Sequence, residues 1–122
     1  MSETGIERAA RLAAHLPGIE TSSWYGTPAL KVAGKGVARL REPGVLMVLC
    51  PLGLKETLIE AEPDLYFETP HYAGWPAMLV RLDAIDDERL QDRLECAWRQ
   101  KAPRKLADAW EAAAAAAMND GM

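Results

Sequence analysis

The sequence lacks an excess of positive charge and a long apolar run. Its 14 lysine and arginine residues are outnumbered by 18 aspartate and glutamate residues, which gives a formal net charge of −4. This balance excludes a protein that binds polyanions over its whole surface, so nucleic-acid binding would need a local basic patch. The longest nearly apolar run, residues 45–54, is far shorter than a membrane span. We therefore expect no membrane partner.

Cysteine and histidine are scarce. Cys50 and Cys96 lie far apart and form no CxxC motif, which is typical of reduced, buried thiols in a cytosolic protein. His15 and His71 have no second histidine or cysteine at the spacing of metal ligands. The first residues show neither the basic nor the apolar region of a secretory signal. We expect a cytoplasmic protein with no metal and no cofactor.

No motif in the sequence specifies a reaction. The segment Gly34-Lys35-Gly36 has neither the length of a phosphate-binding P-loop nor its Lys-Ser/Thr ending. Both cysteines fall in predicted core elements, where a reactive thiolate is not expected. A Cys-His or Ser-His pair that meets only in space stays open as an alternative. The sequence assigns no catalytic residue and favours a binding protein over an enzyme.

The spacing of apolar residues predicts an α+β fold. Thr4 and Glu7 have the spacing of a capping box at the start of a first helix that reaches Leu16. The strands that follow are joined by short turns, which predicts an antiparallel β-sheet with helices on one face. The expected order is α-β-β-β-β-α-β-β-α-α, with strands at 19–25, 29–33, 37–41, 45–49, 65–68 and 77–83 and a helix at 52–61 between the fourth and fifth strands.

The chain length suits one domain that comprises residues 1–122. Its core is expected from about residue 6 to about residue 106. Asp86 is the predicted cap of the third helix, whose inward residues are Leu90, Leu94, Ala97 and Trp98. An alanine-rich last helix is expected at about 104–118, because alanine has the highest helix propensity.

Basic residues gather on a predicted hairpin at 29–41. If Val32 faces Ala38, the same register places Lys31 opposite Arg39 on the other face of the sheet. One interpretation is a solvated face on which long side chains splay apart; the other is an anion site. The residues of that anion site would be Lys31, Lys35, Arg39 and Arg41.

A second basic group lies where the last two helices meet. Positive side chains at the end of a helix also complement its dipole, which is the structural interpretation of Arg99 and Lys101. The binding interpretation adds Arg104 and Lys105 to the nucleic-acid-binding candidates of the hairpin.

The segment Thr69–Pro76 contains two prolines, a glycine and three rings. Two of its rings, Tyr72 and Trp75, could stack on bases or form one wall of a pocket. The other interpretation is that they pack this segment, called here the TP loop, onto its own sheet. The loop candidates for ligand binding are His71, Tyr72 and Trp75.

Several strings together resemble the MmcQ/YjbR family. They are WYGTPALKV at 24–32, ARL at 38–40, TPHYAGWP at 69–76, LVRL at 79–82, AW at 97–98 and APRK at 102–105. The resemblance implies a CyaY-like, frataxin-like α-β sandwich. It also implies DNA binding through a double-wing arrangement of sheet hairpins, in which the hairpin cations act together with His71 and Tyr72.

Two functions therefore follow from the sequence. The first is a DNA-binding protein that contacts nucleic acid through the basic hairpin. The alternative is a non-enzymatic module that binds another protein or a small ligand through the TP loop. A continuous positive face would favour the first, and a concave apolar pocket would favour the second. Iron binding on an acidic helix, as in frataxin, is not expected, because the first helix offers only Glu3 and Glu7 beside Arg8 and Arg11.

Overall fold

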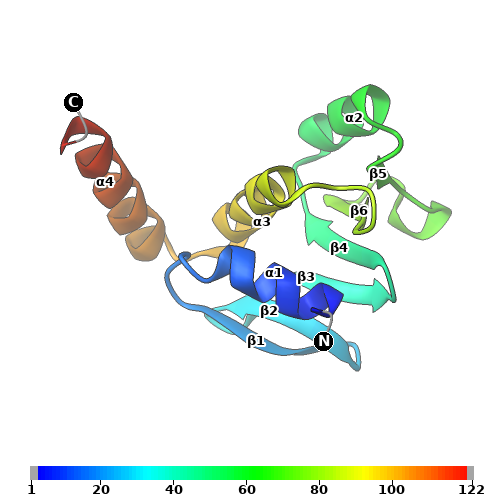
Figure 1. The fold of residues 1–122 in the computed structure, drawn as a ribbon, viewed down its shortest axis with the longest axis horizontal. Coiled ribbons are helices and arrows are strands. Elements are labelled where there is room, and N and C mark those ends of the chain that lie inside the picture. Colours follow the sequence, from blue (N-terminus) through cyan, green and yellow to red (C-terminus); the bar gives the residue numbers. More distant parts are fainter. Residues whose placement is uncertain (1–2, 121–122) are drawn as a thin grey trace.

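A computed structural model describes residues 3–120 of the chain (Figure 1). The order of its main helices and strands agrees with the predicted order, with a short 3-10 turn added in the TP loop. The elements are α1 (Gly5–Ala13), β1 (Ile19–Trp24), β2 (Thr27–Val32), β3 (Lys35–Glu42), β4 (Val45–Leu49), α2 (Leu52–Ala61), β5 (Tyr66–Phe67), η1 (Pro70–Tyr72), β6 (Ala77–Arg81), α3 (Asp87–Lys101) and α4 (Arg104–Asp120).

In the described range the strands form one sheet in the order β1-β2-β3-β4-β6-β5, and every neighbouring pair is antiparallel. The first four strands follow one another as hairpins. The chain then passes through α2 and the edge strand β5 before β6 inserts between β4 and β5. The predicted α+β class is confirmed. Of the helices in residues 3–120, none is long and apolar enough to cross a membrane.

One face of the sheet is covered by α1 and α3, which lie side by side over the strands in Figure 1. The four residues predicted to face inward from α3 are all buried, and Trp98 is fully enclosed. The Trp98 indole Nε1 donates a hydrogen bond to the Pro17 carbonyl at 2.9 Å, so its polar atom is satisfied. This face holds the main core, to which β4 and β6 contribute alternate residues: Leu46, Val48, Met78 and Val80.

Local helix signals act as predicted. Thr4 and Glu7 form the capping box, with the Thr4 amide donating to Glu7 Oε1 at 2.9 Å and the Glu7 amide donating to Thr4 Oγ1 at 3.2 Å. The Asp86 carboxylate accepts from the Arg89 amide at 2.8 Å and caps α3. Helix α1 nevertheless ends at Ala13, three residues before the predicted end at Leu16, because the chain turns ahead of Pro17.

The opposite face carries a second, smaller apolar cluster. The intervening residues of β4 and β6, Met47 and Leu79, point to this side, and Tyr72 of the TP loop packs against them. The TP loop therefore folds back onto the sheet, as its structural interpretation predicts. Its Tyr72 packs on residues of β4 and β6 and also reaches Arg39 and Arg41 of β3.

The predicted hairpin register is wrong. Ala33 and Gly34 form the turn, with positive φ of 51° and 77°, so β3 begins at Lys35 instead of after Gly36. Leu30 pairs with Ala38, whereas Lys31 pairs with Gly36, which leaves Val37 as an extra bulged residue on β3. Lys31 consequently lies opposite Gly36, and Arg39 lies opposite Ala29. Two like charges are thus not paired across the strands.

The apolar residues of 52–61 predict a helix with Leu54, Leu58 and either Ile59 or Ala61 facing inward, and this is wrong at Leu54. Leu54 is 36% exposed, whereas Lys55 next to it is only 1% exposed. Leu58 and Ile59 do pack against the main core, so the buried stripe runs through Lys55, Leu58 and Ile59. Lys55 can be buried because its ammonium group finds three oxygen partners in the TP loop and beside it, as described next.

Candidate ligand-binding site

Lys55 holds the TP loop in place. Its ammonium Nζ donates to the Tyr72 carbonyl at 2.7 Å and to the Trp75 carbonyl at 2.9 Å. The third partner is the Glu68 carboxylate, 2.9 Å away and 37% exposed. Three oxygen acceptors match the three donors of an ammonium group, which compensates its removal from water. Lys55 of α2 thus holds both ends of the turn from Tyr72 to Trp75, which positions the Trp75 side chain.

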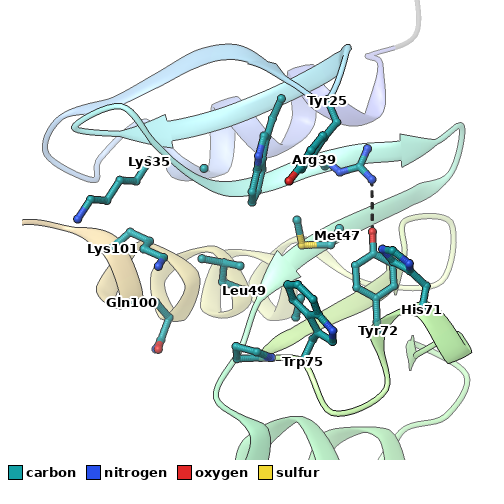
Figure 2. A pocket seen from close by; sticks show the side chains of 14 residues that line it. Tyr25, Lys35, Arg39, Met47, Leu49, His71, Tyr72, Trp75, Gln100 and Lys101 are labelled. Atoms are coloured by element: carbon teal, nitrogen blue, oxygen red, sulfur yellow. Dashed lines mark hydrogen bonds between the residues drawn. The ribbon is translucent and has the colours of Figure 1, made fainter.

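Tyr72 connects the TP loop to the hairpin of β2 and β3. Its side chain is 6% exposed, and its hydroxyl accepts a hydrogen bond from Arg39 Nη2 at 3.3 Å (Figure 2). The other terminal nitrogen of Arg39 donates to Thr27 Oγ1 at 3.1 Å. The guanidinium is therefore oriented by two neutral hydroxyl groups, which leave its positive charge uncompensated.

Arg41 and His71 flank the same tyrosine. The Arg41 guanidinium lies 5.4 Å from the centre of the Tyr72 ring, at cation–π distance, and the His71 ring meets that ring edge-on at 4.9 Å. Arg41 is a bulged residue, because Leu40 pairs with Leu46 and Glu42 pairs with Val45. A bulge redirects side chains, and here the redirected cation packs on the TP loop.

The turn between β1 and β2 places two further rings beside this group. Trp24 and Tyr25 stack with ring centres 5.8 Å apart, and Tyr25 is 81% exposed. A Cβ atom on Gly36 would lie 2.3 Å from the Trp24 ring. Glycine at this position thus allows the indole to lie flat on β3.

A pocket of about 860 Å³ lies between the TP loop, the turn after β1, strands β3 and β4, and the end of α3. Its floor is apolar, and five aromatic rings, including that of His71, stand along its walls. Figure 2 shows Lys35 and Lys101 at one side of the pocket and Arg39 and His71 at the other. The lining residues are Trp24, Tyr25, Lys35, Gly36, Arg39, Met47, Leu49, His71, Tyr72, Trp75, Pro76, Ala77, Gln100 and Lys101.

The charge of the pocket lining has one sign. It includes three permanent cations, Lys35, Arg39 and Lys101, and no aspartate or glutamate. Among the side chains of residues 3–116, no carboxylate lies within 4.0 Å of any of the three. Other basic residues are paired, such as Arg11 with Glu3 and Arg99 with Glu111. The unpaired cations raise the potential of a partly enclosed apolar pocket, which favours an anion.

Five of the nine predicted site residues line the pocket, and four do not. Lys35, Arg39, His71, Tyr72 and Trp75 line the pocket. Arg41 contacts Tyr72 from outside the lining, whereas Lys31 lies on β2 opposite Glu20 and Gly36. Arg104 and Lys105 begin α4 and are exposed, and Arg104 is 3.6 Å from Asp108. The second basic group contributes Lys101 to the pocket instead.

The sequence analysis missed Trp24, Tyr25 and Lys55 as site residues. The two rings precede Gly26 in the string WYG. Aromatic residues in a tight turn indicate a binding surface, because such a turn cannot bury their rings. Lys55 could have been found by its place three and four residues before the inward-facing Leu58 and Ile59. Residue type argues against this position, because lysine is seldom fully buried.

Metal ligands do not gather in the described part of the chain, where no group of three His, Cys, Asp or Glu side chains could hold an ion. The two acidic residues of the first helix region are engaged elsewhere. Glu3 pairs with Arg11 at 2.8 Å, and Glu7 accepts a hydrogen bond from the Thr4 amide. This helix therefore does not present the acidic face on which frataxin-like iron binding depends.

Comparison with known proteins agrees with the resemblance inferred from the sequence. The uncharacterized proteins Rv2570 and MT2646 of Mycobacterium tuberculosis and Mb2600 of Mycobacterium bovis are each 45% identical to the chain over 58 residues. That stretch is 48% of this chain and 45% of each relative, so the match spans less than half the length of these curated relatives.

A solved structure shows the same fold. The crystal structure of Deinococcus radiodurans protein DR2400, with a DUF419 domain, superimposes with a TM-score of 0.64 at 19% identity. The superposition covers 79% of this chain and 77% of the other. In addition, residues 14–100, well over half of the chain, match the family model named YjbR. The chain belongs to the YjbR family.

Proposed function

We propose that this protein binds a small organic anion with a planar ring in the pocket between the TP loop, strands β3 and β4, and the end of α3. The observation that carries the proposal is the composition of the pocket lining, where five aromatic rings and three cations without carboxylate partners surround an apolar floor. Ligand sites are typically apolar cavities of about 300–1,000 Å³ with a few placed polar groups. The observed volume of about 860 Å³ lies in that range.

The positions of the rings and cations in the pocket favour a ligand with a planar ring at one end and an anionic group at the other. A planar ring would lie among the exposed Tyr25, Trp75 and the neighbouring Trp24, where stacking does not need a fixed hydrogen-bond pattern. A phosphate or carboxylate group would be bound by Arg39, whose guanidinium is already oriented by Thr27 and Tyr72. Because these hydroxyl groups are neutral, they hold the guanidinium without competing for its charge.

The proposal is binding without turnover. The lining contains no carboxylate, serine or cysteine, so the pairs that activate a nucleophile are missing from these residues. His71 is the histidine of the lining. Its ring packs edge-on against Tyr72, which is consistent with a supporting role.

The experiment is a tryptophan-fluorescence titration with phenyl phosphate. Phenol and inorganic phosphate serve as probes of the ring and of the anion alone. We expect phenyl phosphate to bind more tightly than either by about tenfold. Arg39→Gln should weaken its binding by about tenfold to a hundredfold, as for the loss of a charged hydrogen bond of about 1.5–3 kcal/mol. The matched control is Arg104→Gln, because Arg104 is 94% exposed and does not line the pocket.

A loss of affinity in Arg104→Gln equal to that in Arg39→Gln would contradict the proposal. Trp75→Ala tests the ring subsite, because Trp75 is 61% exposed and its removal should leave the fold intact. Tyr72→Ala is not an equivalent test, because Tyr72 is buried and its removal would also disturb the loop. Of these two variants, only Trp75→Ala tests ligand binding without also disturbing the fold.

A second candidate is nucleic-acid binding on the same face. The observation that favours it is that Lys35, Arg39 and Arg41 on β3 lie beside the exposed rings Tyr25 and Trp75. Cations that follow a strand next to stacking rings are typical of surfaces that bind single-stranded nucleic acid. The DNA binding implied by the family resemblance would use this surface, although the net charge of −4 opposes binding elsewhere.

Fluorescence anisotropy with labelled single-stranded and duplex oligonucleotides at low salt tests the second candidate. Binding should weaken with salt, and each of Arg39→Gln and Arg41→Gln should lower the slope of log affinity against log salt by about one unit. If phenyl phosphate binds and oligonucleotides do not, the result supports binding of a small organic anion and contradicts nucleic-acid binding. Arg41 distinguishes the two, because it lies outside the pocket lining.

A further inference from the structure

A second pair of cations lines the pocket on the side away from Arg39. Figure 2 shows the Lys35 and Lys101 side chains at one side of the pocket, with Arg39 and His71 at the other. Lys35 begins β3 and Lys101 ends α3, so two elements that are distant in sequence supply one positive region. The anionic group of the proposed ligand is assigned to Arg39, so it does not account for these two lysines.

Aromatic rings extend from one cationic region to the other. The Trp24 ring lies over Gly36, the neighbour of Lys35, where it leaves no room for a Cβ atom. The Tyr25 ring stacks on Trp24 with 5.8 Å between the ring centres, and the Arg39 guanidinium is 5.5 Å from the centre of the Tyr25 ring. A planar ring bound against this wall therefore has a cation beyond each of its two ends.

The two cationic regions are too far apart to bind the same small anionic group. Lys35 and Arg39 are four residues apart on β3, and the bulge at Val37 takes up part of that length. At about 3.3 Å per residue, their Cα atoms are separated by roughly 10–13 Å. In Figure 2 the Lys35 side chain extends away from Arg39, on the side where Lys101 lies. An anion held by Arg39 therefore leaves the two lysines available for another group of the same ligand.

The protein supplies no carboxylate to neutralise these two lysines. Among the side chains of residues 3–116, none lies within 4.0 Å of either ammonium group. Lys101 lies in the last turn of α3, where it also complements the helix dipole. Lys35 lies on a strand, and a sheet has only a small net dipole. An anion bound between them would supply the full countercharge that both lysines lack.

We propose that the preferred ligand continues past its planar ring to a second anionic group, which Lys35 and Lys101 bind together. This inference rests on the proposed function, because it extends the same ligand to the far side of the pocket. The ligand class is a planar aromatic compound with a phosphate or carboxylate group at each end. Two ammonium groups bind either kind of group as point charges, without the fixed geometry of a guanidinium. Because both lysines are exposed, the gain in affinity is moderate and depends on salt.

The test compares the affinities of 4-carboxyphenyl phosphate and its methyl ester, with phenyl phosphate as the reference. The ester has the same ring and phosphate but lacks the second charge. We expect the carboxylate probe to bind about fivefold more tightly than the ester at low salt, and the ratio to fall toward one as salt is added. If phenyl phosphate binds while acid and ester bind equally, the second anion subsite is overturned and the proposed function stands. If phenyl phosphate itself does not bind, the proposed function fails together with its extension.

Variants assign the second charge to its partners. Lys35→Gln and Lys101→Gln should each lower the affinity ratio of acid to ester, and the double variant should bring it to about one. Arg39→Gln should leave this ratio near its wild-type value, because Arg39 binds the phosphate that both probes share. Lys105→Gln is the matched control, since Lys105 is exposed on α4 and does not line the pocket. A ratio that persists in the double variant, or that Lys105→Gln lowers equally, would overturn the proposal.

Discussion

Tyr25 combines an unfavourable backbone with an exposed ring. Its φ of 54° lies in the left-handed region, which costs a residue with a side chain about 1–2 kcal/mol. Asparagine and glycine are the usual residues at this place in a two-residue hairpin turn. Strained residues persist mainly where surrounding structure or function holds them. The Tyr25 ring stands at the pocket with Arg39 5.5 Å from its centre, which is the function that we assign to it.

Tyr25→Asn tests this assignment. Relief of backbone strain should offset the lost contacts of the ring with Trp24 and Arg39, which are each worth about 0.5–1 kcal/mol at exposed sites. The free energy of unfolding in urea should therefore stay within about 0.5 kcal/mol, while phenyl phosphate affinity falls about fivefold. Ala33→Asn is the control, since Ala33 has the same strained conformation with a φ of 51° and lies outside the pocket. Unaltered affinity in Tyr25→Asn would exclude the ring from the site.

Lys55 gives a second prediction at this scale. Lys55→Met keeps the length of the side chain but leaves the carbonyls of Tyr72 and Trp75 without a donor. We expect a loss of about 2–4 kcal/mol in the free energy of unfolding, since breaking a buried charged contact leaves unpaired groups. Lys105→Met, on the exposed surface, should change it by less than about 0.5 kcal/mol. Equal small effects in both variants would show that Lys55 does not hold the TP loop.

At the scale of elements, α1 and α3 are joined by charged contacts at one end. Arg8 reaches across to Asp87 at 2.8 Å and to the Leu82 and Ile85 carbonyls, both at 2.7 Å. Arg11 approaches the same Asp87 carboxylate at 3.3 Å. The hydrogen bond from Arg8, followed by that from Arg11, holds the pKa of Asp87 below its ordinary value.

This shift predicts how stability responds to acid. A carboxyl whose pKa is lowered on folding contributes stability above its unfolded pKa, about 3.9 for aspartate, and loses it as pH falls through the folded value. The free energy of unfolding should therefore decrease below about pH 4. Asp87→Asn should be less stable at neutral pH and should show a shallower acid decrease. Asp92→Asn, with no ion pair in the described range, is the control. A wild-type acid slope retained in Asp87→Asn would contradict the assignment.

Much of the element order could be predicted because it depends on local patterns. The caps at Thr4 and Asp86 and the inward stripe of α3 are properties of short segments, and each is found where expected. The bulges at Val37 and Arg41 could not be predicted, because an extra residue is defined only by its partner strand. Those two bulges decide which side chains of β3 reach the pocket. The register error in the hairpin has the same cause.

At the scale of the whole molecule, the sheet is covered differently on its two faces. Helices α1 and α3 close one face, whereas the other is only partly covered by the TP loop. Figure 1 shows α4 extending away from the sheet, so it leaves this second face uncovered. The candidate ligand-binding pocket occupies the part of that face that the TP loop leaves open.

The site itself was only partly predictable. The sequence analysis named Lys35, Arg39, His71, Tyr72 and Trp75, which do line one pocket. It could not show that the hairpin and the TP loop share a face, since that depends on β6 lying beside β4. It also could not show that Lys101 approaches from α3, because that contact joins distant parts of the chain.

The most direct measurement is a proton–nitrogen correlation spectrum of the labelled protein during titration with phenyl phosphate. The four tryptophans give four indole signals, and the structure divides them into two pairs. Trp24 and Trp75 line the pocket, whereas Trp98 and Trp110 pack against each other with ring centres 5.5 Å apart in the core. We predict that the signals of the first pair shift with saturation while those of the second pair do not. Shifts confined to the second pair, or equal for all four, would contradict a binding site on the open face of the sheet.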